Sequence, residues 1–564
     1  MSVHVAGRVL ASTSRLPTAI DVLIVGGGAT GAGILRDLAR RGLRCLLVDK
    51  SDFGTGTSGR YHGLLHSGGR YVGKDPQAAH ECIVENRVIR RIAPGCVEDT
   101  GGLFVATPDD PDDYVDAFPG RCAAVGIPCE DYPLAQLFRR EPALDRRIRR
   151  AFTVPDASLE PWQLIEGNIE DARMRGSDAL PYHQVVGMQR NGAFIASVDI
   201  ADVRSGTIQR MAPRMVVSAS GAWAGRIAAL AGAELKMAPG KGTMLIFNQR
   251  MTDTVVNRCH KPGDGDIMVP VHTVAILGTT ETRIDDPDRC DPDRDEVAGL
   301  IAEGEKLFPD LGRMRILRAY AGARPLYSAA PTTAEDGREI SRAHVVLDHE
   351  ARDGVSNFVS IVGGKLTTYR SMAEETSDLV AGKLGVAAAC TTADEIMPGQ
   401  VPGTNYWLGH RLAEHESEGG GDADLICECE FVTRDGLERF LTERWPCSLD
   451  DVRRGTRLGM GPCQGAFCAF RAAGIVAERV ATRTLAPAGD GAVAPGTPAS
   501  DGPDQRAIAA DLADRALVAF MRERYKGSRP IAYGSQLQEL WLATGMYWGV
   551  LGIDTFAGGH DGQG

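Results

Sequence analysis

The sequence predicts an α/β fold that is followed by a smaller, mainly helical part. Three observations support this prediction. Residues 21–50 have the pattern of a strand, a glycine turn, a helix and a second strand. Apolar runs that end in glycine turns recur at residues 215–224 and 360–370. Beyond residue 424 the pattern changes to amphipathic helical stretches between two pairs of cysteines.

The unit at residues 21–50, DVLIVGGGATGAGILRDLARRGLRCLLVDK, contains a G-x-G-x-x-G motif. Its glycines, Gly26, Gly28 and Gly31, stand between the first apolar run and the helix. Glycine at these positions permits a tight turn, lets the backbone approach a pyrophosphate and lets the helix pack closely on the strand. Asp49 closes the second strand, where an acidic side chain can hydrogen-bond a ribose hydroxyl. The glycines alone are weak evidence, but together with both strands and the acidic residue they predict a dinucleotide site.

Composition limits the possible classes of protein. The 564 residues are enough for roughly two to four domains, and 43% hydrophobic with 24% charged residues is typical of a globular protein. The net charge of −12 argues against nucleic-acid binding. No apolar stretch approaches the ~18 residues of a membrane span. The first 20 residues lack the pattern of a signal peptide, so the 13 cysteines indicate a reducing cytosol, in which clustered cysteines indicate a metal.

A loop rich in glycine, serine and histidine follows at residues 54–71, and a helix is predicted at 81–92. Backbone donors and small hydroxyls of such a loop can surround phosphates and a ring system. With GRYHGLLHSGGRY at 59–71 and AAHECIVENRVIRRIAPGCVEDTGGLFVATPDD at 78–110, the chain resembles the flavin-dependent glycerol-3-phosphate dehydrogenases. Within this family it is most similar to the large catalytic subunit of the anaerobic, multi-subunit enzyme. Because the superfamily opens with the same kind of glycine motif, the resemblance implies FAD rather than NAD.

The resemblance extends over roughly residues 20–390 through separate landmarks. They are VPDASLEPWQLIEGNIEDARMRG at 154–176, MVVSASGAWA at 215–224, PGKGTMLIF at 239–247, NRCH at 257–260, ILGTT at 276–280, YAGARPL at 320–326 and SIVGGKLTTYR at 360–370. The family fold implies an FAD-binding, Rossmann-like domain of the glutathione-reductase and D-amino-acid-oxidase type. An antiparallel-sheet substrate domain is expected to interleave with it, over roughly residues 75–150 and 235–330.

Four further segments are expected after residue 390. We predict a linker at 391–424, a helical cysteine domain at 425–480, a flexible linker rich in alanine, glycine and proline at 482–505, and a helical C-terminal segment at 506–564.

The cysteine domain contains Cys427, Cys429, Cys463 and Cys468 in a C-x-C…C-x4-C arrangement. Two close pairs of thiolates can ligate the two irons of a [2Fe–2S] cluster or a single zinc ion. Structural zinc more often uses C-x2-C spacing, and a site without metal stays possible. The arrangement resembles the small helical domain named after bacterioferritin-associated ferredoxin, which implies a [2Fe–2S] cluster.

Flavin-dependent oxidation of a secondary alcohol needs a base for the hydroxyl proton, and a phosphorylated substrate needs cations. By resemblance, His260 or Arg324 assists proton removal, while Arg70, Tyr71, Arg324 and Lys365 bind the substrate. The resemblance and the motifs place FAD contacts at Gly26, Gly28, Gly31, Asp49, Lys50, Thr57, Ser58, His62, Ser67, Gly68, Gly221, Gly363, Gly364, Lys365, Leu366 and Thr367.

The expected reaction is the oxidation of sn-glycerol 3-phosphate to dihydroxyacetone phosphate, with hydride transfer to flavin N5. The cysteine domain implies electron export through an iron–sulfur relay and partner subunits to a quinone, by a cytoplasmic protein that is peripheral on the inner face of the cell membrane. An FAD-dependent amine or amino-acid dehydrogenase with the same cysteine domain is the main alternative. A redox-sensing iron–sulfur protein with a vestigial flavin domain is another, and a nicotinamide-linked dehydrogenase fits the loop at 54–71 least.

Overall fold

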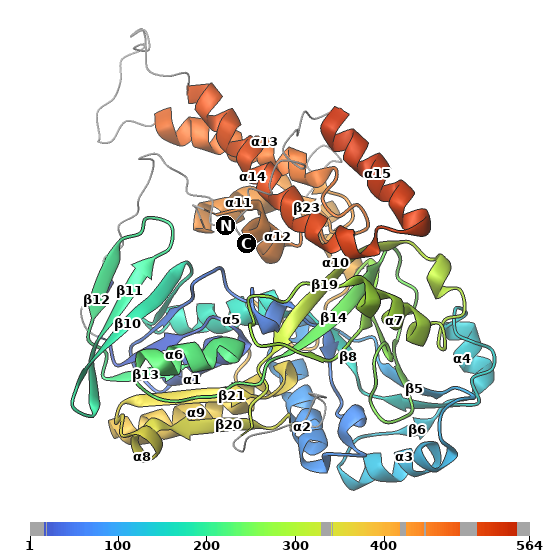
Figure 1. The fold of residues 1–564 in the computed structure, drawn as a ribbon, viewed down its shortest axis with the longest axis horizontal. Helices are drawn as coiled ribbons and strands as arrows, with labels where there is room; N and C mark the ends of the chain where they lie inside the picture. Colours follow the sequence, from blue (N-terminus) through green and yellow to red (C-terminus); the bar gives the residue numbers. More distant parts are fainter. Residues whose placement is uncertain are drawn as a thin grey trace.

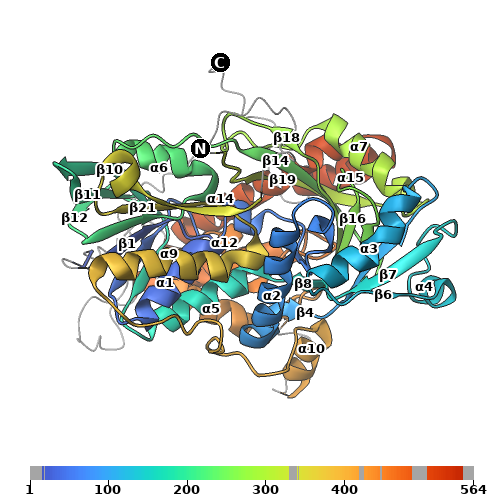
Figure 2. The same ribbon diagram turned by 90° about the horizontal axis from the view of Figure 1, so that it is seen from below.

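The structure is a computed structural model in which two sheets and their helices form a body beneath a helical C-terminal part (Figures 1 and 2). The residues that it describes are 16–17, 20–328, 340, 342–417, 425–444, 447–485 and 505–549.

The first sheet has six strands in the order β20-β21-β13-β1-β2-β9. These strands are β1 (Val22–Val25), β2 (Cys45–Val48), β9 (Asp178–Leu180), β13 (Met215–Ser218), β20 (His344–Asp348) and β21 (Phe358–Gly363). The neighbours pair in parallel except for β20 and β21, which are antiparallel. Every residue of β1 is apolar and buried, as is typical of a parallel strand that is covered on both faces.

The two faces of this sheet have separate cores, because successive side chains of a strand point to opposite faces. The covering elements are α1 (Ala29–Arg40), α5 (Pro161–Arg173), α6 (Ala224–Leu230), α9 (Tyr369–Leu384), β10 (His183–Asn191), β11 (Phe194–Asp202) and β12 (Ile208–Met211). Val22 and Ile24 pack in the core of α1, α5 and α9, which lie side by side in Figure 2. Leu23 and Val25 pack toward α6 and the three-stranded antiparallel sheet β10-β11-β12.

The second sheet has nine strands and is mainly antiparallel, with β5 and β15 its parallel pair. Along the order β18-β14-β17-β16-β15-β5-β7-β6, with β19 also paired to β14, the strands are β5 (Gly102–Ala106), β6 (Glu130–Asp131), β7 (Arg150–Val154), β14 (Gly240–Phe247), β15 (Val255–Arg258), β16 (Ile267–Val271), β17 (Val274–Gly278), β18 (Thr282–Arg283) and β19 (Ile316–Arg324). Its accompanying helices are α2 (Pro76–Ile92), α3 (Asp112–Ala124), α4 (Leu134–Arg140) and α7 (Arg294–Gly304).

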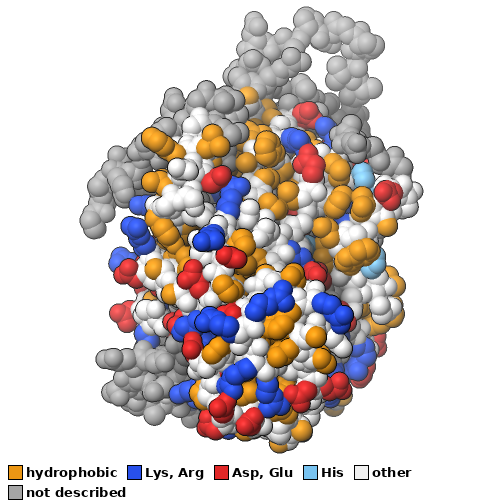
Figure 3. Space-filling view, turned by 90° about the vertical axis from the view of Figure 1, so that its right-hand side faces the viewer, with side chains coloured by type: hydrophobic (Ala, Val, Ile, Leu, Met, Phe, Trp, Pro, Cys, Tyr) orange, Lys and Arg blue, Asp and Glu red, His pale blue; other side chains and the backbone are white. Residues whose placement is uncertain are grey.

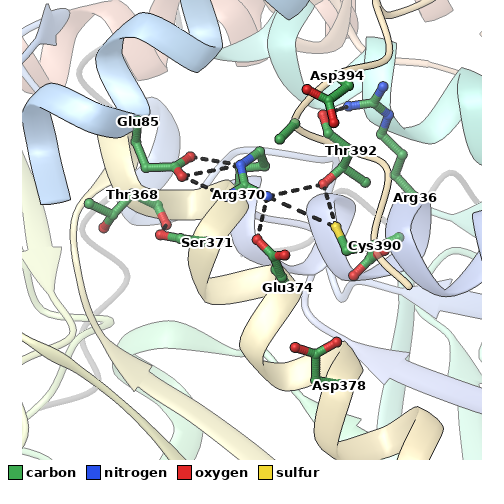
Figure 4. A network of polar contacts seen from close by, with 12 residues as sticks. Arg36, Glu85, Thr368, Arg370, Ser371, Glu374, Asp378, Cys390, Thr392 and Asp394 are labelled. Atoms are coloured by element: carbon green, nitrogen blue, oxygen red, sulfur yellow. Dashed lines mark hydrogen bonds and ion pairs between the residues drawn. The ribbon is translucent and has the colours of Figure 1, made fainter. Parts of the chain in front are cut away.

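A small sheet and a buried ion pair connect the two halves of the body. The small sheet, β3-β8-β4, consists of β3 (Leu64–Leu65), β4 (Val97–Glu98) and β8 (Ala157–Leu159). Arg370 of α9 pairs with Glu85 of α2 at 2.6 Å and with Glu374 at 2.7 Å (Figure 4). The same guanidinium donates to Thr392 at 3.3 Å, which fixes the chain segment after α9. Breaking such a buried pair would leave a charge without compensation.

The C-terminal part is helical and packs around its own apolar core. Its elements are α10 (Leu408–Ser417), β22 (Leu425–Cys427), β23 (Val432–Thr433), α11 (Arg434–Arg444), α12 (Leu449–Thr456), α13 (Cys468–Leu485), α14 (Gln505–Ser528) and α15 (Gly534–Gly549). Helix α10 lies inside the segment 391–424 that we expect to be a linker. Of the expected flexible linker, 486–504 lie outside the described residues, as do 550–564 of the C-terminal segment.

The surface seen in Figure 3 mixes basic and acidic side chains over the body, with hydrophobic side chains gathered toward the top. Helix α15, at the upper right of Figure 1, exposes Leu537, Trp541 and Leu542. Within the described part of the chain, we find no helix with the length and apolar content needed to cross a bilayer.

Candidate functional site

A glycine turn joins β1 to α1 at the carboxyl edge of the parallel strands. Gly26 has a φ of +114°, and its N–H donates to Val48 O at 2.9 Å. A Cβ on Gly31 would lie 1.9 Å from Gly26 O, so the close approach of α1 to the turn requires glycine. Gly28 is the N-cap of α1 and has no side chain to cap the helix, while the Ser58 hydroxyl accepts the Ala29 N–H at 3.0 Å. Such an end favours an anion, because its first N–H groups have no partner within the helix.

Asp49 ends β2 beside this turn. Its Oδ2 accepts the N–H of Gly27 at 2.7 Å, and its Oδ1 accepts the N–H of Ser51 at 2.8 Å. Burial raises the pKa of Asp49 to about 6, while these two donors favour the charged form. Lys50 is partly exposed, with Nζ 3.2 Å from Asp288 Oδ1. The carboxylate therefore lies beside the glycine turn at the end of β2, and its contact with a ribose stays a prediction.

A cavity of about 770 Å³ opens at this edge of the sheet, within the usual size range of cofactor and ligand sites. The predicted site residues that line it are Gly26, Gly28, Asp49, Lys50, Thr57, Ser58, His62, Tyr71, Gly221, Arg324, Gly363, Gly364, Lys365, Leu366 and Thr367. Five other predicted residues do not line it: Gly31, Ser67, Gly68, Arg70 and His260. The structure thus brings together segments that are more than 300 residues apart in the sequence.

Ser67 and Gly68 shape the loop without reaching the cavity. The Ser67 N–H donates to Asp156 Oδ1 at 2.6 Å, and Ser67 is fully buried. Gly68 has a φ of +100°, and a Cβ there would lie 2.3 Å from Ala79 O. These contacts fix the course of the loop against α2.

His62, His66 and His183 line the cavity, and the first two are neutral at pH 7. Burial lowers the pKa of His62 to about 3 and places that of His66 well below its usual value, with Arg70 adding to both shifts. His62 Nδ1 accepts the N–H of Leu64 at 3.2 Å, so its proton resides on Nε2. The ring of His66 makes no hydrogen bond to any residue that the structure describes, and it lies 5.6 Å from the ring of Tyr71. His66 therefore has a nitrogen that is free to accept a proton.

Three cations meet on one wall of the cavity. Arg324 Nη1 and Arg342 Nη2 lie 2.6 and 3.1 Å from the same Oε2 of Glu281. Lys365 Nζ donates to Arg342 O at 3.4 Å and lies 4.9 Å from the Tyr71 ring centroid. Three positive charges thus lie on one wall of the cavity, which favours an anionic ligand. Sequence reasoning missed Arg342, because its segment carries no motif and only the fold brings it to Arg324.

Arg70 and His260 meet at Asp266, away from the cavity lining. Arg70 Nη2 donates to both carboxylate oxygens of Asp266, at 2.9 and 3.0 Å. His260 Nε2 lies 3.5 Å from Asp266 Oδ2, and burial lowers the pKa of His260. The two residues therefore meet at one buried carboxylate outside the cavity lining.

The four cysteines of the predicted metal site lie together in the C-terminal part. Cys427 and Cys463 each interact with both Cys429 and Cys468, so the four thiols form a closed ring of neighbours. Hydrogen bonds from these neighbours lower the pKa of Cys427 and Cys463, although burial opposes the shift.

Backbone N–H groups near this ring favour the thiolates. Those of Glu430 and Gly459 help to lower the pKa of Cys427, and those of Gly465 and Phe467 help to lower the pKa of Cys463. The described side chains show no group of three or more ligands already at metal-binding geometry. The donor set itself, four sulfurs in contact with N–H groups that stabilise negative charge, fits an iron–sulfur cluster or zinc.

Comparison with known proteins agrees with this geometry. Residues 21–378 match the family model "FAD dependent oxidoreductase". The chain is 40% identical to the A subunit of anaerobic glycerol-3-phosphate dehydrogenase from Escherichia coli K12, over 95% of this chain and 97% of that protein. It is 39% identical to the A1 subunit of the enzyme of the same name from Haloferax volcanii, over 93% and 89% of the two chains.

Solved structures share the fold. The FAD complex of glycerol-3-phosphate dehydrogenase from Bacillus halodurans matches with a TM-score of 0.60 and 20% identity, over 88% of this chain and 94% of that one. L-alpha-glycerophosphate oxidase from Mycoplasma pneumoniae, with FAD bound, matches with a TM-score of 0.53 and 17% identity, over 68% and 100%. The expected α/β, FAD-binding fold and the expected family are confirmed. The chain belongs to the family of anaerobic glycerol-3-phosphate dehydrogenase A subunits, within the FAD-dependent oxidoreductases.

Proposed function

We propose that this chain oxidises sn-glycerol 3-phosphate to dihydroxyacetone phosphate with FAD. The observation that carries the proposal is the group of three cations, Arg324, Arg342 and Lys365, beside two neutral imidazoles in one cavity. Three cations on one wall of the cavity suit a phosphate dianion better than the carboxylate of an amino acid. The relatives named as glycerol-3-phosphate dehydrogenase subunits support the same substrate.

The residues present fit FAD. The glycine turn and the N-terminal end of α1 suit a pyrophosphate, and Asp49 suits a ribose hydroxyl. FAD, when bound, supplies the acceptor for the hydride from C2. The polypeptide has to bind the phosphate, orient C2 and take up the hydroxyl proton.

We assign proton removal to His66 in preference to His260, which does not line the cavity. A ring nitrogen of His66 has no partner among the described residues, whereas the acceptor nitrogen of His62 is occupied. Burial, together with nearby cations that include Arg70 and Lys365, holds the pKa of His66 down. A bound phosphate dianion would offset these positive charges and raise the pKa of His66 toward neutrality, where a base acts best. Arg324 would stabilise negative charge on the substrate.

Cys427, Cys429, Cys463 and Cys468 would hold a [2Fe–2S] cluster. Such a cluster, when bound, supplies single-electron transfer. We propose that the chain is the FAD subunit of a larger assembly, that the final acceptor is a quinone, and that partner subunits hold the protein at the inner face of the cell membrane. The relatives are themselves named as subunits of an enzyme, which supports the existence of partners.

The visible spectrum of the anaerobically purified chain tests both proposals. Glycerol 3-phosphate is expected to bleach the flavin band near ~450 nm, whereas sarcosine and proline are not. Iron–sulfur absorption is expected beside the flavin and should be lost in the Cys468→Ser variant, which retains the bleaching. A flavin that an amine reduces and glycerol 3-phosphate leaves oxidised would refute the assigned substrate.

A further inference from the structure

The C-terminal part meets the FAD-binding body along a set of ion pairs, and one of them lies beside the cysteine ring. Arg457 follows α12, is buried, and donates from Nε to Glu430 Oε2 at 2.9 Å. Its Nη1 pairs with Glu160, the N-cap residue of α5 in the body. The body and the cysteine segment therefore share one guanidinium.

Arg457 is joined to both chain segments whose backbone lies near Cys427. The backbone N–H groups of Glu430 and Gly459 help to lower the pKa of Cys427, which indicates that both segments lie beside its sulfur. Arg457 binds the side chain of Glu430 and stands two residues before Gly459. One side chain thus sets the spacing between the two chain segments that hold this sulfur.

A second residue of the body also contacts Glu430. His272, in the turn between β16 and β17, places Nδ1 3.1 Å from Glu430 Oε2. The ring of Tyr406 stacks on His272 with centroids 4.0 Å apart, and the His272 N–H donates to Glu98 at 3.4 Å. Glu430 is fully buried, so it depends on these partners for compensation of its charge.

The backbone at this junction is held in a conformation that non-glycine residues rarely adopt. Arg457, His272 and Phe431 have φ angles of 66°, 51° and 49°. Three such residues at one junction indicate that the surrounding contacts determine the backbone, which is a pattern of functional sites.

The same junction reaches the wall of the FAD cavity. Tyr61 lines the cavity and donates its hydroxyl to Leu159 O at 2.6 Å. Leu159 directly precedes Glu160, the body partner of Arg457. A short, hydrogen-bonded stretch of protein thus connects the cavity wall to the segment that carries Cys427 and Cys429.

We propose that Arg457 is a positioning residue that locks the cysteine ring to the cavity wall and sets the N–H···S hydrogen bonds on Cys427. Hydrogen bonds to ligand sulfurs are a determinant of iron–sulfur reduction potentials. Arg457 therefore tunes the potential of the centre held by the four cysteines. The inference rests on the proposed [2Fe–2S] centre.

The test is a dye-mediated potentiometric titration of the full-length, FAD-containing chain, followed by the spectrum of the reduced cluster. Arg457→Met is expected to make the midpoint potential of the cluster more negative by at least about 59 mV, which corresponds to a tenfold change in the one-electron equilibrium constant. Arg457→Lys keeps the charge but cannot fork between Glu430 and Glu160, so it is expected to shift the potential in the same direction. If charge alone mattered, Arg457→Lys would match the wild type, and that result would overturn the positioning role.

Two further variants guard against a simple loss of folding. Glu160→Gln leaves the Arg457–Glu430 pair intact and weakens only the attachment to the body, and a smaller negative shift is expected. Glu166→Gln is the matched control, because Glu166 also lies on α5 and pairs with Arg444 of the C-terminal part. This control should keep the wild-type potential.

Iron content, the midpoint potential and flavin bleaching separate the role of Arg457 from the proposed function. Full iron content with an unchanged potential in the Arg457 and Glu160 variants would overturn the inference alone. A wild-type chain that binds no iron would overturn the relay and with it the inference. Flavin bleaching by glycerol 3-phosphate, measured in the same samples, reports separately on the dehydrogenase.

Discussion

The glycine turn offers a sharp test of how the FAD site is built, through the substitution Gly31→Ala. The added Cβ would lie 1.9 Å from Gly26 O and 3.1 Å from Gly26 C, both backbone atoms of the turn. Helix α1 would have to move away from β1, and the turn that presents Gly28 would change shape. Because neither atom can swing aside, the substitution acts on the position of the helix end itself.

The magnitude follows from two opposing terms. Overpacking of a close contact costs about 1–3 kcal/mol, and a contact this short belongs at the upper end. Alanine regains about 0.5–1 kcal/mol in a helix relative to glycine, so a net loss of about 2 kcal/mol is expected. Displacement of the pyrophosphate donors should also weaken FAD binding tenfold or more, which corresponds to about 1.4 kcal/mol.

Thermal unfolding with and without FAD, together with titration of the FAD-free protein by flavin fluorescence, measures both effects. Gly382→Ala is the matched control, since Gly382 is also helical, in α9, and a Cβ there meets nothing within 4 Å. The control should be stabilised by about 0.5–1 kcal/mol with unchanged FAD affinity. A Gly31→Ala protein that unfolds and binds FAD like the wild type would refute the assigned role of the close contact.

Three other outcomes are expected. Burial lowers the pKa values of His62 and His272 to about 3, whereas a histidine in the unfolded chain has a pKa of about 6.5. Between these two pH values the unfolded chain therefore binds more protons than the folded chain. Stability is then lost as pH falls from about 6.5, by about 1.4 kcal/mol per unit for each histidine, and a urea midpoint equal at pH 7 and 5.5 would contradict this. Arg342→Ala should raise KM for glycerol 3-phosphate about 10–100-fold with FAD retained, as loss of a charged hydrogen bond costs about 1.5–3 kcal/mol; a KM within about twofold of wild type speaks against phosphate binding. His66→Asn should lower kcat by about 10²–10⁴ and His260→Asn by much less, so the reverse order would move the base to His260.

Features that are local in the sequence could be predicted from it. The strand, glycines and helix of residues 21–50 form one unit, and Asp49 stands where the spacing places it. The four cysteines are recognisable as two close pairs, and the fold brings the pairs together. Family resemblance supplies the sheet architecture, which periodicity alone could not.

Features that depend on contacts between distant segments could not be predicted. Arg342 has no motif around it, and its place beside Arg324 is fixed by Glu281, about 60 residues away in the sequence. Arg70 and His260 carry a strong family signal, yet neither lines the cavity: Arg70 donates to Asp266, and His260 lies 3.5 Å from the same carboxylate. Helix α10 could not be predicted, because the polar composition of its segment is typical of a linker.

The order of strands in the first sheet has a consequence for biosynthesis. β1 lies between β2 and β13, and Met215 of β13 leaves the ribosome about 200 residues after Val22. At ~5–20 residues per second, the nascent chain carries an apolar β1 with one open edge for about 10–40 seconds. Newly made protein therefore exposes this edge over the same interval, and the lining of the FAD cavity is complete only after Met372 has emerged.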